Sequence, residues 1–210
     1  MLRIISGRMK GRKLQGPAEG FLGIRPTRDH VRQAMFNVLE AHGLVWQGSC
    51  GLDLYAGTGA LGIEAASRGA DRVVWVERQP VALDIVQKNL TTLGLGPNAQ
   101  YALLPVSVPK ALEDARLSAY LPLDWIFLDP PFIKEATTAE EIAQVMRALF
   151  QRAEAGGFFK PQAWICMEVE DKDEDFVKGL LDATYKATVL FKIKQFGRSS
   201  VFFWQVSGGA

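Results

Sequence analysis

The chain has 210 residues, of which 48% are hydrophobic and 22% charged, as expected for a globular domain with its own core. It has no apolar run of the roughly 18 residues that a membrane-spanning helix needs, and MLRIISGRMKGRKL is a poor signal peptide. We therefore expect a cytoplasmic protein without membrane contact. Residues 1–48 contain eight Lys or Arg and three acids, a net charge of +5, although the whole chain carries +1. Such a basic arm suggests a polyanionic partner; the alternative is a solvated extension with incidental charge.

Helices and strands are expected to alternate after the arm. RPTRDHVRQAMFNVLEAHG predicts a helix with one apolar face, with Thr27 as its N-cap and Gly43 just after its end. Further helices are predicted at 59–69, 80–94, 108–120, 137–157 and 173–183, the fourth opening with a capping box formed by Thr138 and Glu141. Apolar strands are predicted between them at 50–56, 72–77, 99–105, 123–129 and 163–170.

Two β-rich segments close the chain. YKATVLFKIKQFG and SSVFFWQV are joined by a short polar turn, which is typical of an antiparallel hairpin. Together with the alternation, they predict an α/β fold: a Rossmann-like, seven-stranded, mainly parallel sheet with helices on both faces and a basic N-terminal extension. We assign residues 1–48 to an arm and helix of the same domain, and residues 49–210 to its main part.

Residues that could bind a metal are few and scattered. Cys50 and Cys166 lie far apart among apolar neighbours, and His30 and His42 lack partners at metal-ligand spacing. We expect buried, reduced thiols and no metal. The tryptophans fall mostly within predicted strands, which indicates core positions.

The stretch LDLYAGTGALG contains a G-x-G-x-x-G pattern directly after the first strand. Gly57, Thr58 and Gly59 would form a tight loop whose N–H groups approach a ligand closely. Glu77 lies twenty residues after Gly57, where an acid that binds ribose hydroxyls is expected, and Asp53 could hold an ammonium group. These residues fit either NAD or S-adenosylmethionine.

The stretch LDPPF separates the two cofactors. Asp129 and the carbonyl of Pro130 can accept hydrogen bonds from an exocyclic amine of a nucleobase, which directs the nitrogen lone pair toward a methyl donor. The rings of Pro130 and Pro131 make this turn rigid, and Phe132 can stack on an extracted base. Because parallel strands end at one edge of a sheet, we expect Asp129 to lie beside the glycine loop. The sequence therefore favours a nucleobase methyltransferase that uses S-adenosylmethionine.

Four segments resemble the RsmD family of 16S rRNA guanine-N2 methyltransferases: RIISGRMKGRKL, RPTRDHVRQAMFNVL, LDLYAGTGALGIEAASRGA and FLDPPF. The resemblance implies a class I methyltransferase domain that acts on the 2-amino group of a guanine in the small ribosomal subunit or its assembly intermediate. Nothing in the sequence requires more than a monomer, which we therefore expect. The resemblance also implies that the basic arm and the segment from Arg25 to Thr27 lie near the substrate entrance and the cofactor. We assign Thr27, Tyr55 and Arg78 to the cofactor site. Phosphate contacts are expected from Lys10, Arg12, Lys13, Arg25 and Arg28. Ser107 is the one polar side chain in the segment where adenine contacts are expected, with backbone groups near Val106 to Val108 as the alternative.

Three other functions compete with this one. A DNA adenine-N6 or cytosine-N4 methyltransferase would use the same chemistry, but the chain has no recognisable DNA-reading domain. An NAD-dependent oxidoreductase would need a substrate domain with a catalytic His, Lys or Tyr, and none is apparent. A non-catalytic RNA-binding module would not need the intact motif from Asp129 to Phe132.

Overall fold

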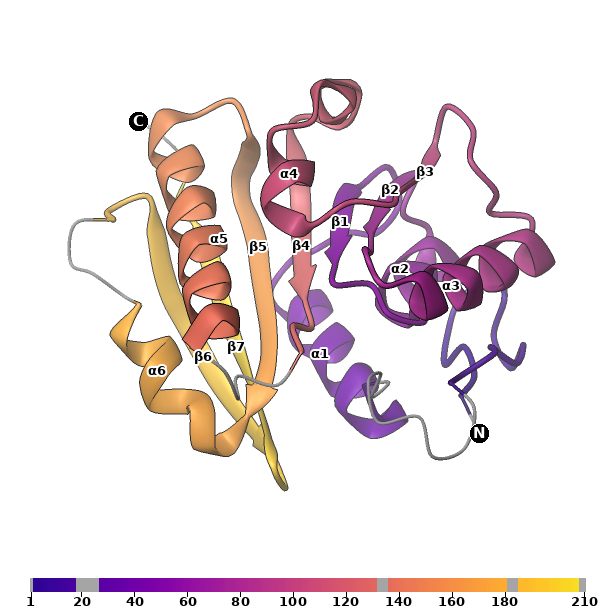
Figure 1. Cartoon of the computed structure of the whole chain (residues 1–210), viewed down its shortest axis with the longest axis horizontal. Coiled ribbons are helices and arrows are strands. Elements are labelled where there is room, and N and C mark those ends of the chain that lie inside the picture. Colours follow the sequence, from indigo (N-terminus) through magenta and orange to yellow (C-terminus); the bar gives the residue numbers. More distant parts are fainter. Residues whose placement is uncertain (1, 18–26, 132–135, 181–184, 208–210) are drawn as a thin grey trace.

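A seven-stranded sheet runs through the middle of the molecule in the computed structural model, which describes residues 2–17, 27–131, 136–180 and 185–207 (Figure 1). The strand order is β3-β2-β1-β4-β5-β7-β6, with parallel pairing from β3 to β5 and antiparallel pairing of β7 with both β5 and β6. The strands are β1 (Cys50–Leu54), β2 (Arg72–Val76), β3 (Tyr101–Leu104), β4 (Leu123–Leu128), β5 (Phe159–Glu170), β6 (Thr188–Phe196) and β7 (Ser199–Val206). This arrangement confirms the predicted fold class, including the closing hairpin.

Helices cover both faces of the sheet. The α-helices are α1 (Asp29–Ala41), α2 (Ala60–Arg68), α3 (Pro80–Leu93), α4 (Val108–Leu112), α5 (Ala136–Ala155) and α6 (Glu174–Gly179). One buried cluster joins the sheet to α4, α5 and α6, and the other joins it to α1, α2 and α3 (Figure 1). The thiols of Cys50 and Cys166 are buried and unbridged, as expected. None of the described helices is long and apolar enough to cross a membrane.

Four of the predicted helices differ in their boundaries from the structure. Arg28, not Thr27, is the N-cap of α1, and the Thr27 hydroxyl instead donates a hydrogen bond to Asp129. Helix α5 is already formed at Ala136, so the predicted capping box lies inside the helix. The predicted helix at 108–120 is two pieces, α4 and the 3₁₀ helix η1 (Ala115–Tyr120), because the Asp114 carboxylate accepts the Arg116 N–H and starts a new turn. Helix α6 ends at Gly179, before the predicted 183.

The N-terminal arm is an ordered part of this fold. Its residues fold back on themselves, with an antiparallel bridge between Arg3 and Lys13. The backbone N–H groups of Ile5 and Ser6 donate to the Glu64 carboxylate of α2 at 2.8 and 2.9 Å. The arm is therefore attached to the helix that follows the glycine loop.

A buried ionic cluster fixes this attachment. Glu64 also accepts a hydrogen bond from Arg68 Nε at 2.9 Å and lies 3.9 Å from Arg32 Nε of α1. Arg32 is fully buried and donates to the Arg3 carbonyl at 2.5 Å and to Asp29 at 3.0 Å. Because buried charges are tolerated only when they are paired, these contacts hold the arm, α1 and α2 in one arrangement.

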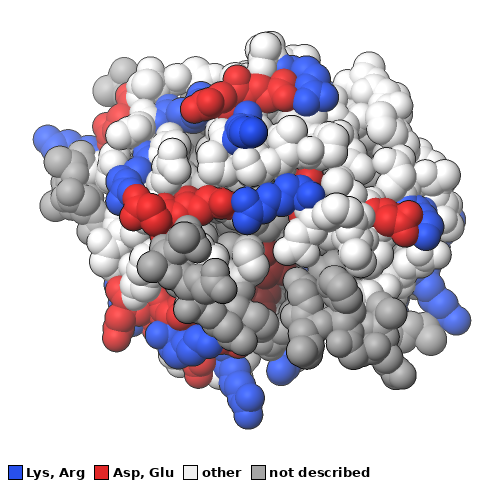
Figure 2. Space-filling model, in the orientation of Figure 1, with Lys and Arg blue, Asp and Glu red and all other residues white. Residues whose placement is uncertain are grey.

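Charged side chains of both signs are mixed on one face of the molecule (Figure 2). On the face shown in Figure 2, Lys and Arg side chains lie next to Asp and Glu side chains instead of forming one continuous basic area. The basic excess of the chain is confined to its first 48 residues.

Candidate functional site

A cavity lies at the carboxyl ends of β1, β2, β4 and β5, the edge where doubly wound sheets bind ligands. It brings together the residues that the sequence analysis placed at three separate strand ends. Ten of the candidate residues line it: Thr27, Asp53, Tyr55, Gly57, Thr58, Glu77, Arg78, Asp129, Pro130 and Pro131. Two further candidates, Phe132 and Arg25, lie outside the described residues.

The glycines of the loop have different tasks. Gly57 and Gly59 have φ values of +55° and +77°, which side-chain-bearing residues rarely adopt, so they allow the tight turn into α2. Gly59 is the N-cap of α2 and does not line the cavity. At Gly62 a Cβ would lie 2.4 Å from the indole nitrogen of Trp75. The third glycine of the pattern therefore allows α2 to pack closely on β2 and has no contact with the cavity.

Asp53 is the most deeply buried acid of the cavity wall. Its side chain is 1% exposed, and its Oδ2 accepts the Gly62 N–H at 2.8 Å. Burial raises the pKa of Asp53 to about 8, with a smaller contribution from the Glu77 charge and an opposing one from the Gly62 hydrogen bond. A cationic group bound next to Asp53 would reverse this shift and favour the ionised carboxylate.

The Glu77 carboxylate binds three backbone N–H groups of the cavity wall. Its Oε2 accepts the Gly57 N–H at 2.9 Å, and its Oε1 accepts the N–H groups of Arg78 and Gln79 at 2.7 and 2.8 Å. The side chain is 8% exposed and lines the cavity. Each carboxylate oxygen has two lone pairs, so Glu77 can accept a ligand hydroxyl while it keeps these contacts.

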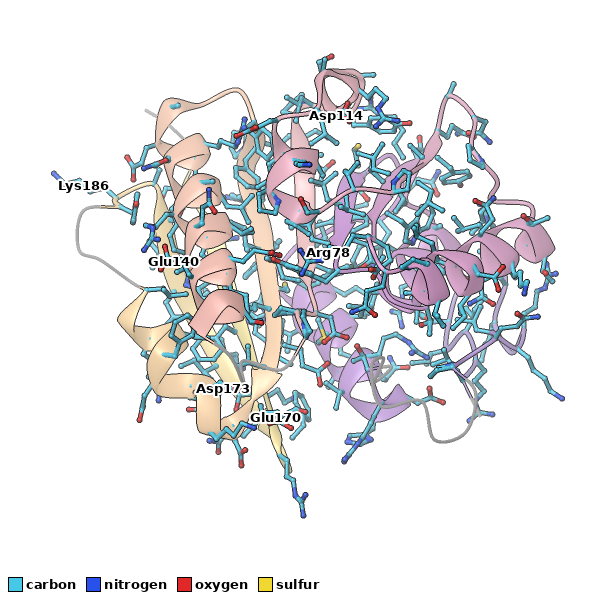
Figure 3. All side chains as sticks on the ribbon, viewed as in Figure 1. Arg78, Asp114, Glu140, Glu170, Asp173 and Lys186 are labelled. Carbon is cyan, nitrogen blue, oxygen red and sulfur yellow. The ribbon has the colours of Figure 1, made fainter. Side chains whose placement is uncertain are left out.

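Glu141 joins the two sides of the cavity mouth, although the sequence analysis gave it only a capping role. Its Oε1 accepts the Tyr55 hydroxyl at 3.2 Å, and its Oε2 lies 3.0 Å from Arg78 Nη1. In Figure 3, Arg78 lies near the centre of the view, and α5, the helix that carries Glu141, lies to its left. Tyr55 has a φ of +59°, an uncommon value for a residue other than glycine. Loop residues after β1 and β2 are thus connected to the helix that follows the LDPPF segment.

Asp129 occupies the opposite side of the cavity from the loop after β2. Its backbone N–H donates to the Leu54 carbonyl at 3.3 Å, and its Oδ2 accepts the Thr27 hydroxyl at 2.8 Å. Thr27 is 5% exposed, so water has little access to its hydroxyl, whereas Asp129 is half-buried and faces the cavity. The hydrogen bond from Thr27 fixes the orientation of the Asp129 carboxylate from a segment 102 residues away in the sequence.

The far wall of the cavity contains residues that the sequence analysis missed. They come from the end of β5 and its surroundings, and include Glu168, Val169, Glu170, Asp173 and Ser199. Figure 3 shows Glu170 and Asp173 near the end of β5. The available signal was MEVE, where acids interrupt an apolar strand at its carboxyl end.

The basic candidates on the arm lie on its surface. Lys10, Arg12 and Lys13 are exposed, as is Arg28 just before α1. Arg12 donates one guanidinium hydrogen bond to the Thr92 carbonyl of α3 at 2.7 Å. A guanidinium has five N–H donors, so this contact does not use its full capacity.

The residues that line the cavity suit the functional groups of S-adenosylmethionine. Buried carboxylates suit its cationic amino-acid head and its ribose hydroxyls, and the apolar side chains of Val106 and Val108 offer a surface for a flat ring. Ser107, the polar candidate for adenine, does not line the cavity. Among the described residues, no three His, Cys, Asp or Glu side chains gather as metal ligands would.

Comparison with known proteins gives three kinds of match. The model of the family described as conserved hypothetical protein 95 matches residues 2–205. The protein YlbH of Bacillus subtilis is 39% identical over 138 residues, 66% of this chain and 71% of its own length. Ribosomal RNA small subunit methyltransferase D of Haemophilus influenzae is 34% identical over 176 residues, 84% of this chain and 82% of its own length. The solved structure of yhhF from Escherichia coli superposes with a TM-score of 0.72 at 26% identity and covers 99% of both chains.

Proposed function

Since the chain belongs to the family described as conserved hypothetical protein 95, the RsmD family of methyltransferases that use S-adenosylmethionine, we propose that it methylates the 2-amino group of a guanine in 16S ribosomal RNA. The observation that carries this proposal is that Asp129, with its carboxylate oriented by Thr27, lines the same cavity as Asp53 and Glu77. One cavity thus holds acceptors for the cofactor and for an exocyclic amine.

The cofactor half of the cavity lies along β1 and β2. When bound, S-adenosylmethionine supplies an electrophilic methyl group on a sulfonium. Asp53 would hold its ammonium group, and Glu77 would accept hydrogen bonds from the ribose hydroxyls. Gly57 and Thr58 would border the amino-acid head, and Gly59 would contribute only to the turn of the loop. Tyr55 and Arg78, fixed by Glu141, would close the outer side of this half.

The target half lies around Asp129. The nitrogen lone pair of an exocyclic amine is delocalised into the base, so the free amine is a poor nucleophile. Asp129 and the Pro130 carbonyl would each accept a hydrogen bond from one N–H of the amine. These two hydrogen bonds would direct the nitrogen lone pair toward the methyl group. Pro131 keeps the turn rigid, and Phe132 would stack on the base. Positioning the reacting atoms about 3–3.5 Å apart would supply much of the rate.

The basic arm would supply affinity for RNA. Lys10, Arg12, Lys13 and Arg28 are exposed, and with Arg25 they would contact phosphates without reading sequence. The partner would be 16S rRNA within the small subunit or its assembly intermediate, and the enzyme would work as a cytoplasmic monomer.

Labelled S-adenosylmethionine and three substrates test the proposal: small subunits that lack the modification, naked 16S rRNA, and DNA. The wild type should produce N2-methylguanine in a ribosomal sample. Asp129→Ala should lower the rate by at least about 10²-fold, because the amine loses a charged acceptor, while calorimetry finds its cofactor affinity within about twofold of the wild type. Label that appears only in DNA, or normal turnover by Asp129→Ala, would refute the proposal.

A further inference from the structure

We propose that Glu168 recognises the Watson–Crick edge of the target guanine by accepting its N1–H, and thereby selects guanine against adenine and cytosine. This inference rests on the proposed function and deepens it. It concerns the far wall of the cavity, at the end of β5, and not the cofactor half.

Strand register brings Glu168 beside Asp129. Leu128 of β4 is paired with Met167 of β5, so the next positions along these parallel strands are Asp129 and Glu168. Neighbouring strands lie about 4.8 Å apart, which is close enough for the two side chains to reach neighbouring atoms of one base. Both residues line the same cavity.

The two carboxylates also lie on the same face of the sheet. Phe127 and Cys166 belong to the cluster that packs on α1, whereas Leu128 and Met167 belong to the cluster that packs on α5. Side chains alternate between the faces of a strand, so the residues at 129 and 168 point to the α1 side. The hydrogen bond from Thr27, which precedes α1, to Asp129 agrees with this direction.

The edges of the bases differ in what they offer to a second carboxylate. Guanine presents two adjacent donors, the N1–H and the 2-amino group. Adenine and cytosine each present an amino group next to an unprotonated ring nitrogen, which is an acceptor. With Asp129 on the amino group, a carboxylate at 168 would gain a charge-assisted hydrogen bond from guanine N1–H. The same carboxylate would face a lone pair on adenine or cytosine and repel it.

Burial makes this discrimination strong. Glu168 is 8% exposed, so water cannot easily replace a missing donor or screen the repulsion. Sites that hydrogen-bond a substrate group reject analogues without that group far more strongly than apolar pockets do. The neighbouring acids Glu170 and Asp173 keep this wall rich in acceptors, which suits an edge made of donors.

The test uses 2-aminopurine, which keeps the 2-amino group but has an unprotonated N1. The modified guanine is first located with the wild type, and small subunits are then reconstituted with guanine or 2-aminopurine at that position. Wild type, Glu168→Gln and Glu140→Gln are compared by kcat/KM. Glu140 is exposed on α5 outside the cavity. Glu140→Gln therefore removes one negative charge, as Glu168→Gln does, without changing the cavity wall. Calorimetric affinity for S-adenosylmethionine checks that each variant is folded.

The wild type and Glu140→Gln should prefer guanine over 2-aminopurine by at least about 100-fold. In Glu168→Gln the preference should fall at least tenfold, because the amide can donate to the unprotonated N1. The absence of O6 in 2-aminopurine affects all enzymes equally and cancels in the comparison. An unchanged preference in Glu168→Gln overturns the assignment of Glu168 alone. A wild type that forms no N2-methylguanine overturns the proposed function instead.

Discussion

The buried carboxylate of Glu64 should contribute more to stability than any surface ion pair of this chain. Glu64→Gln removes the charge but nearly keeps the shape of the side chain. It leaves Arg32, whose side chain is fully buried, with Asp29 as its remaining acidic contact among the described residues. It also turns an amide N–H₂ toward a site where the Ile5, Ser6 and Arg68 donors converge.

Breaking a buried ion pair from one side costs about 3–5 kcal/mol. Since Asp29 still contacts Arg32, we expect the lower end of that range, a loss of about 3 kcal/mol in the free energy of unfolding. With an m-value of about 2–3 kcal/mol per M, the urea midpoint should fall by about 1–1.5 M. Fluorescence of the buried tryptophans reports the transition.

The matched control is Asp84→Asn. Asp84 forms an exposed ion pair with Lys88 on α3, with both side chains more than half exposed, so its loss should cost about 0.5 kcal/mol or less. A loss below about 1 kcal/mol for Glu64→Gln at an unchanged m-value would show that the ionic cluster does not hold the arm in the way its contacts imply.

Three further predictions concern the cavity and the arm. Asp53 has a folded-state pKa of about 8 against about 3.9 unfolded, so the ligand-free folded protein binds the extra proton between these values and loses stability as pH rises from about 4 to 8. Asp53→Asn should remove this contribution to the slope of the unfolding free energy against pH, measured by urea titrations at several pH values. If the wild type and Asp53→Asn have the same slope, the raised pKa of Asp53 is refuted. Glu77→Ala should weaken S-adenosylmethionine binding at least about tenfold by calorimetry, because both the loop contacts and the ribose acceptor are lost; unchanged affinity would rule out that role. Replacing Lys10, Arg12 and Lys13 by Gln should reduce the slope of log K for RNA against log salt by about 2. If the slope stays the same, these three side chains do not contact RNA phosphates.

The fold could be predicted because its signals are local. The first four strands are short apolar runs, and SSVFFWQV coincides with β7 to the residue. The position of β7 between β5 and β6 could not be predicted in the same way, since it depends on contacts between distant segments. The prediction that Thr27 is the N-cap of α1 was wrong for a related reason. The Thr27 hydroxyl, which would otherwise bind the first N–H groups of the helix, is hydrogen-bonded to Asp129, far along the chain.

The candidate site was predictable where residues belong to a motif. Asp53, Glu77 and Asp129 stand at or near strand ends, within the glycine and LDPPF motifs or at the spacing they set, and all three line the cavity. Glu141 and Glu168 belong to neither the glycine pattern nor LDPPF, and their places at the cavity follow only from how α5 and β5 pack. The glycine pattern alone also does not reveal that Gly62 packs against Trp75, which leaves no space for a side chain at position 62.

The order of the strands has a consequence for how the cavity forms during synthesis. β7 follows every other strand in the sequence, yet it is inserted between β5 and β6. Glu168 is paired with Val201 of β7, and Ser199 of β7 lines the cavity. A growing chain can therefore fold its cofactor loops early, but the wall that carries Glu168 gains its second neighbouring strand only after residue 206 has left the ribosome. Nascent chains should be able to bind cofactor before they can select a base.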